Sequence, residues 1–170
     1  MPGKPVKIDV IIEEDTPDMK FRLESTDIPI GPDNHPYFKN CDVMGFDITF
    51  TLKDPNNLGY RFADMDADAI WSAVGTGCPH SEAWEIFKSP KVLGAGKMLK
   101  VENANTIAAN FAFTMNVSKS GQKPYRELDP GGTNQNGSVR QNIGKDVLLA
   151  VGGVVAGSLL TLGAQALLQG

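Results

Sequence analysis

A continuous run of uncharged residues closes this chain of 170 amino acids and limits what it can fold into. The run extends from Val147 to Leu168, reads VLLAVGGVVAGSLLTLGAQALL, and contains seven Leu and four Val. At about 1.5 Å rise per residue, a helix of this length spans roughly 33 Å, close to the ~30 Å hydrocarbon core of a bilayer. We therefore expect a single transmembrane helix at residues 147–168.

The apolar side chains of this run favour insertion into a membrane by roughly 3 to 6 kcal/mol in total. The four Gly residues and the polar Ser158, Thr161 and Gln165 reduce that gain. Two other interpretations stay open: a buried helix of a soluble oligomer, or a hydrophobic arm that is ordered only in an assembly. A chain this small has little interior in which to bury such a helix on all sides, which favours the membrane.

Small residues recur along one face of the expected helix. They are spaced three and four apart and include a Gly-x-x-x-Gly pair: Ala150, Gly153, Gly157, Thr161 and Ala164. Such a stripe allows a second helix to approach closely, which is a main source of association energy in lipid, although glycine is also common in membrane helices generally. The expected partners are the lipid bilayer and transmembrane helices of other subunits or of a second copy.

The charges that flank the run predict its orientation. Arg140 and Lys145 precede it and no basic residue follows it, so the positive-inside rule places residues 1–146 on the cytoplasmic side. The first residues contain no apolar core of signal-peptide length. Cys41 and Cys78 provide no disulfide framework and are expected to be reduced thiols. The net charge of −4, without a basic patch, argues against a nucleic-acid partner.

Alternation of apolar and polar residues characterises the chain before this tail and predicts strands. The clearest runs are Val6–Ile12, Phe21–Leu23, Phe46–Leu52, Met98–Glu102 and Ile107–Val117. A strand through Leu58–Phe62 is expected to pair with Phe46–Leu52 across an Asp-Pro-Asn-Asn turn. Shorter strands are expected at Ile70–Val74, Trp84–Phe87 and Tyr125–Leu128. Roughly six to eight short strands without a long amphipathic helix predict an all-β fold, a small antiparallel β-sandwich.

The chain is therefore expected to have three parts. Residues 1–129 form the β-sandwich domain. Residues 130–146, rich in Gly, Asn and Gln, form a polar tether, and residues 147–168 form the transmembrane helix.

Several short strings follow one another in an order that resembles a bacterial family. They are ITFTL (48–52), GYRF (59–62), AIW (69–71), VENANTIAANFAFTMNV (101–117) and LDPGGTNQNG (128–137). Over roughly residues 6–137 the chain resembles the DP-EP and inclusion-body (PixA-like) proteins, although Gly131 and Gly132 replace the usual apolar residues after Asp-Pro. The resemblance implies a small all-β sandwich and, since that group has no established catalytic role, adds no active site.

Two motifs suggest ion or phosphate binding but depart from the patterns that such sites require. Asp64, Asp66 and Asp68 begin like a calcium loop, yet Ala69 stands at the sixth position and Gly75 at the twelfth, where Gly and Glu are required. Turn-forming acids are the favoured interpretation. The segment 94–97 (GAGK) is similar to the end of a phosphate loop, but Met98 cannot ligate magnesium, and we reject that assignment.

The remaining candidate residues are His35, Cys41, Cys78 and His80, which fit no common zinc spacing. A nucleophile drawn from Cys78, His80 and Ser81 lacks an oriented base, a third group and an oxyanion site. Trp71 and Trp84 can stack on sugars, but a tryptophan between apolar neighbours is more often part of a core. No catalytic residue, metal or cofactor is therefore assigned.

Two classes of function follow. In the first, the chain is a non-catalytic, membrane-anchored accessory or structural subunit of a membrane protein complex, such as an energy-transducing one. In the second, it is a soluble-type β-sandwich that self-associates or binds a small ligand or glycan, with its hydrophobic tail buried in the assembly. An enzyme is not expected.

Overall fold

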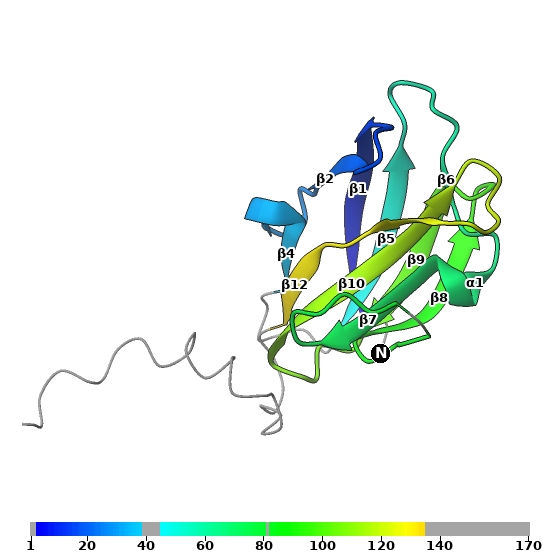
Figure 1. Ribbon diagram of the computed structural model, residues 1–170. Coiled ribbons are helices and arrows are strands. Elements are labelled where there is room, and N and C mark those ends of the chain that lie inside the picture. The colour runs from blue at the N-terminus through cyan, green and yellow to red at the C-terminus, as the bar shows by residue number, and fades with distance from the viewer. Residues whose placement is uncertain (1–2, 39–44, 81, 135–170) are drawn as a thin grey trace, which may run out of the picture. The chain divides into compact units, whose positions relative to one another are not determined.

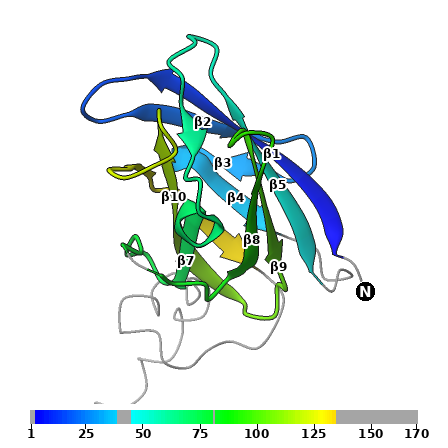
Figure 2. The same cartoon turned by 90° about the vertical axis from the view of Figure 1, so that its right-hand side faces the viewer.

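The structure, a computed structural model, describes residues 3–38, 45–80 and 82–134 (Figure 1). These residues form two β-sheets that pack face to face, and Figure 2 separates the two layers. The five-stranded sheet has the order β2-β1-β5-β9-β8, with β1 Lys4–Glu14, β2 Lys20–Glu24, β5 Phe46–Lys53, β8 Phe87–Leu93 and β9 Met98–Asn103. The expected all-β sandwich is confirmed.

The seven-stranded sheet is built around one long strand, β10 (Ala109–Ser118). Its main path is β11-β10-β12-β4-β3, with β11 Arg126–Leu128, β12 Gly131–Asn134, β4 His35–Phe38 and β3 Ile30–Gly31. Strands β6 (Arg61–Phe62) and β7 (Ile70–Val74) also pair with β10. Two short helices, η1 (Pro32–Asn34) and α1 (Asp66–Ala69), complete the described elements.

The sheets are mixed, so the expectation of a wholly antiparallel sandwich is wrong. β1 and β5 pair in parallel from Lys4 opposite Phe46 to Ile11 opposite Lys53, and β4 and β12 are also parallel. Parallel neighbours require a long crossover. The chain between β1 and β5 provides one, because it visits the other sheet through β3 and β4 before it returns.

The expected hairpin between β5 and residues 58–62 is also wrong. β6 pairs with β10 in the opposite sheet, and the free edge of β5 is taken by β9 instead. The turn itself explains the change of direction: Asp54 accepts hydrogen bonds from the amides of Leu58 (2.8 Å) and Gly59 (2.6 Å). These bonds fold the loop back on itself and direct the chain out of the first sheet.

Two further boundaries differ from the expectation. Trp84 forms only an isolated bridge to Ser72, and the strand begins at Phe87. At the other end, Gly131–Asn134, expected to be tether, forms β12 between β10 and β4. Glycine is needed in this strand because a Cβ at Gly132 would lie 2.4 Å from Cζ of Phe111.

Aromatic side chains from both sheets fill the space between them. The largest fully buried side chains include seven phenylalanines, namely Phe38, Phe46, Phe50, Phe62, Phe87, Phe111 and Phe113. Phe87 is central: its ring meets Phe111 and Phe113 edge-on, with centroids 5.4 and 5.1 Å apart. Edge-to-face contacts of this kind add to the hydrophobic gain of burial.

Within residues 3–38, 45–80 and 82–134, no helix is long and apolar enough to cross a membrane. The predicted helix at 147–168, its stripe of small residues and the tether from residue 135 onward lie outside the described residues.

Candidate functional site

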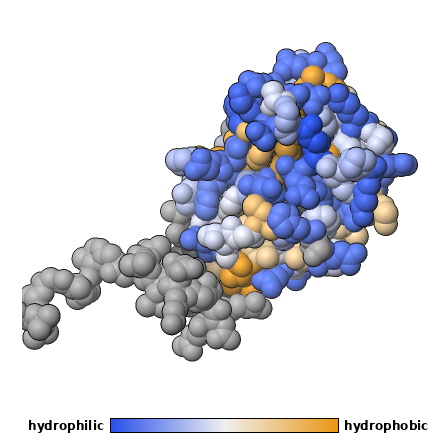
Figure 3. All heavy atoms as spheres, viewed as in Figure 1, coloured by the Kyte–Doolittle hydropathy of each residue, from blue (hydrophilic) through white to orange (hydrophobic). Residues whose placement is uncertain are grey.

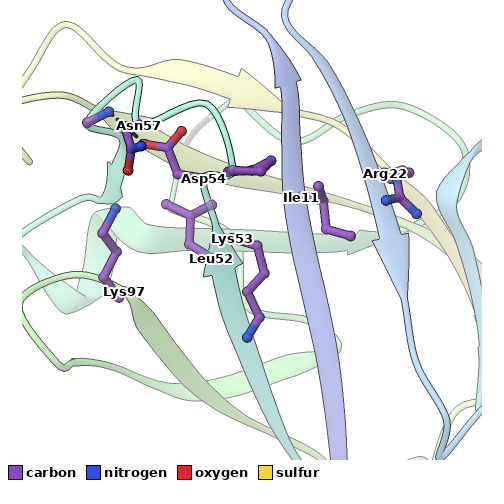
Figure 4. A pocket seen from close by; sticks show the side chains of 9 residues that line it. Ile11, Arg22, Leu52, Lys53, Asp54, Asn57 and Lys97 are labelled. Atoms are coloured by element: carbon purple, nitrogen blue, oxygen red, sulfur yellow. Dashed lines mark hydrogen bonds between the residues drawn. The ribbon is translucent and has the colours of Figure 1, made fainter.

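Two hollows stand out on the surface of the part of the sandwich that the structure describes. The larger, which we call the Lys97 hollow, has a volume of about 720 Å³ and lies where β5 ends in its turn (Figure 4). Ile11, Leu52 and Pro55 give it apolar walls. Around them lie three basic side chains and one carboxylate, those of Arg22, Lys53, Lys97 and Asp54. Such a lining suits an anion only if the basic groups are free and point to one place.

The basic groups of Arg22 and Lys97 already bind other residues. The guanidinium of Arg22 is held by Glu13 (2.7 Å) and by Glu24, and Lys97 donates to the Tyr60 carbonyl oxygen at 2.5 Å. Figure 4 shows the side chains of Arg22, Lys53 and Lys97 spread along the hollow without converging. The Lys97 hollow therefore does not form an anion site.

The smaller hollow, which we call the Trp84 hollow, has a volume of about 520 Å³. It lies between α1 and β8 and is lined by Asp66, Ala67, Trp84, Lys88, Ser89 and Pro90. The lining residues thus carry an indole, a carboxylate, an ammonium group and a hydroxyl, of which the Asp66 carboxylate accepts the Val92 amide and the Lys88 ammonium group donates to the Trp84 carbonyl oxygen. Ligand sites of proteins commonly combine an apolar or aromatic surface with a few polar groups in this way.

The two tryptophans have different roles. Trp71 is buried, at 7% exposure, and its Nε1 donates to the Ala67 carbonyl oxygen at 3.0 Å. Trp84 is partly exposed, while its Nε1 donates to the Ile70 carbonyl oxygen at 3.2 Å. Because its one polar atom is fixed to the backbone, the ring of Trp84 is held in place beside the Trp84 hollow.

The three carboxylates of the calcium-like segment do not converge. Asp66 accepts the Val92 amide at 2.6 Å, whereas Asp68 accepts the Tyr125 hydroxyl at 3.0 Å. Asp64 lies 3.8 Å from a guanidinium nitrogen of Arg61. Each acid serves a separate structural contact, in agreement with their interpretation as turn-forming acids.

The glycine-rich segment 94–97 forms the turn between β8 and β9. The amides of Gly96 and Lys97 donate to Leu93 and Gly94 within the turn, so they are not available to a phosphate. This agrees with the rejection of a phosphate loop.

The predicted histidines and cysteines lie in separate contacts where they are described. His35 contacts Thr133 at 2.7 Å, and His80 contacts Glu127 at 3.3 Å. Burial, together with Asp129 and Glu127, raises the pKa of the Cys78 thiol and keeps it protonated. Cys41 and Ser81 lie outside the described residues. Among the described residues, no group of three or more His, Cys, Asp or Glu is placed to hold a metal ion.

Two polar clusters had no signal in the sequence. On the outer face of the seven-stranded sheet, Thr133 on β12 contacts His35 and donates to Oδ1 of Asn110 at 2.8 Å. Burial lowers the pKa of His35, so its neutral form is favoured. His35 and Thr133 are 98 residues apart, so local spacing carries no sign of their contact.

The second cluster joins the two sheets at the tip of β1. Asp15 accepts from Lys119 (2.8 Å) and from the Tyr60 hydroxyl (2.5 Å), and Arg126 lies 3.4 Å away. The hydrogen bonds from Lys119 and then from Tyr60 lower the pKa of Asp15. We interpret this cluster as structural, because it ties β1 to β10 and β11.

The face viewed in Figure 3 is mostly hydrophilic, and its hydrophobic areas are small and separate. No protein-family model and no curated protein sequence matches this chain. Its function is therefore argued from the residues themselves.

Proposed function

We propose that this chain is a non-catalytic accessory or structural subunit of a membrane protein complex, anchored by a single C-terminal transmembrane helix. The uncharged run Val147–Leu168 carries the proposal, since it has the length and composition of a membrane span. Its stripe of small residues provides a surface for helices of other subunits. The positive-inside rule assigns the β-sandwich to the cytoplasmic side.

The chemistry of the sandwich supports a non-catalytic role. Cys78 has a raised pKa, which opposes formation of the reactive thiolate. Asp66 and Asp68 accept structural hydrogen bonds. The resemblance to inclusion-body proteins supports the same interpretation, because that group has no established catalytic role.

Alkaline carbonate extraction of the full chain tests the proposal. The native chain should stay in the membrane pellet. Val155→Arg should release it, because an arginine near the centre of the span costs about 2.5 to 3.5 kcal/mol, comparable with the total insertion gain. Ser138→Arg places the same charge before the span and should leave the chain in the pellet. Release of the native chain into the supernatant would refute a spanning helix.

The second candidate is a soluble-type β-sandwich that self-associates or binds a ligand, with its tail buried in the assembly. The partly exposed indole in the Trp84 hollow favours the ligand-binding form of this function. A full chain that remains soluble and of one size without detergent would support this candidate and contradict the membrane anchor.

A further inference from the structure

We propose that the Trp84 hollow binds a neutral saccharide, with one sugar ring stacked on the indole of Trp84. This proposal goes beyond the membrane-anchored role, and it holds whether or not the tail crosses a membrane. Three observations carry it: the composition of the hollow, the backbone conformation of β8, and the fixed orientation of Trp84.

The composition of the hollow matches the chemistry of a sugar ring. A pyranose presents C–H groups on its faces and hydroxyls at its rim, so it needs an aromatic surface bordered by hydrogen-bonding groups. Trp84 supplies the aromatic surface and Ser89 a hydroxyl, while Asp66 accepts the Val92 amide through Oδ1 and keeps its second oxygen as an acceptor. Lys88 already donates to the Trp84 carbonyl oxygen, so its remaining N–H groups are the donors it can offer. The one carboxylate and the one ammonium group balance each other, which favours a neutral ligand over an ionic one.

The backbone of β8 is distorted at this hollow. The pairing of β8 with β9 shifts register between Lys88 and Lys91, and Ser89 has a φ of 50°. A left-handed conformation is costly for a residue other than glycine, and bulges and strained residues of this kind cluster at functional sites. The bulge changes the direction of the chain where Ser89 stands, and this residue lines the hollow.

Protection of a sheet edge explains only part of this arrangement. β8 is an edge strand, and both Pro90 and the bond from the Val92 amide to Asp66 prevent another strand from pairing there. That role does not require an indole. The Nε1 atom of Trp84 is bound to the Ile70 carbonyl oxygen, so the ring is positioned before any ligand arrives, which lowers the entropic cost of binding.

The test measures saccharide binding to the full chain in a detergent without a sugar head group. The probes are cellopentaose, maltopentaose and N-acetylchitopentaose, titrated to millimolar concentration. In a Trp71→Phe background, Trp84 is the only tryptophan and its emission reports the occupancy of the hollow. Isothermal titration calorimetry of the unmodified chain gives the same affinity without a substitution.

Two glycine substitutions separate binding from folding. Ser89→Gly removes the hydroxyl and relieves the positive φ, so it should raise the thermal unfolding temperature and weaken saccharide binding about tenfold. Ala95→Gly is the matched control: Ala95 has a φ of 54° in the turn after β8 and does not line the hollow. It should raise the unfolding temperature and leave the affinity unchanged.

A saturable change with at least one probe, weakened by Ser89→Gly and retained by Ala95→Gly, supports the site. The proposal is overturned if no probe produces a saturable change in either measurement, or if both glycine variants bind with equal affinity. Neither negative result bears on the membrane anchor, which carbonate extraction tests separately.

Discussion

Replacement of Phe87 by Ala is the most direct test of how the two sheets are joined. Phe87 begins β8 at the edge of the five-stranded sheet, yet it is completely buried. Its ring lies within 6.2 Å of four other phenylalanine rings, one from its own five-stranded sheet (Phe50) and three from the seven-stranded sheet (Phe38, Phe111 and Phe113). Phe38, Phe111 and Phe113 each contact three phenylalanine rings.

The expected loss of free energy of unfolding follows from the burial of Phe87 and from its ring contacts. Truncation of a buried Phe to Ala costs about 3 to 5 kcal/mol, and Phe87 belongs at the upper end because the cavity is walled by rigid rings. Phe87→Leu keeps most of the apolar volume and loses the edge-to-face pairs, so it should cost about 1 to 2 kcal/mol. Phe21→Ala, at a partly buried position packed against the margin of the core, is the control and should cost less than about 1 kcal/mol.

Urea denaturation of the full chain in detergent, followed by tryptophan fluorescence, to which buried Trp71 contributes, measures these free energies of unfolding. The loss of free energy of unfolding should be largest for Phe87→Ala, smaller for Phe87→Leu and smallest for Phe21→Ala. A cost below about 1 kcal/mol for Phe87→Ala, with an unchanged denaturant slope, would contradict the packing of β8 against the opposite sheet.

Three further predictions concern the outer face, the tight strand and the tail. Burial lowers the pKa of His35, so the free energy of unfolding should fall as the pH drops below the ordinary value of 6.5, and His35→Gln should remove part of that fall in urea titrations at several pH values. Gly132→Ala should cost about 1 to 3 kcal/mol in urea denaturation, because its Cβ would meet the ring of Phe111 at 2.4 Å. If the stripe binds a helix, Gly157→Leu should release the chain from its complex while Val155→Leu, off the stripe, should not; equal co-purification of both would show that the stripe is accidental.

The sequence predicted strands wherever apolar and polar residues alternate over several positions. β1, β5 and β10 follow this rule, since Val6, Phe50 and Phe113 all point into the core. It failed at β12, where Gly131 and Gly132 have no side chains to form a pattern and look like a linker. The parallel pairing of β1 with β5 was also missed, because strand partners are set by contacts between distant segments.

The residues of the proposed saccharide site were predicted less well, for a related reason. Trp71 and Trp84 each stand between one apolar and one polar residue in the sequence, and only the folded chain makes one buried and the other partly exposed. The left-handed Ser89 is equally hidden, because serine gives no local sign of a positive φ. The calcium-like and phosphate-like segments could be rejected from the sequence alone, because such sites require particular residues at fixed positions.

The edges of the five-stranded sheet bear on the choice between the two proposed functions. At β2, the Asn34 side chain accepts from the Leu23 amide at 2.7 Å and donates to the Phe21 carbonyl oxygen at 3.0 Å, so it occupies the groups that a new strand would use. At β8, Asp66 binds the Val92 amide in the same way. Exposed edges promote self-association, and side chains that bind their backbone groups oppose it. Self-association of this domain by strand addition at these two edges is therefore disfavoured, which leaves the edges of the seven-stranded sheet, the faces of the sandwich and the tail for an assembly. Of these surfaces, only the tail contains the uncharged run that carries the proposed membrane anchor.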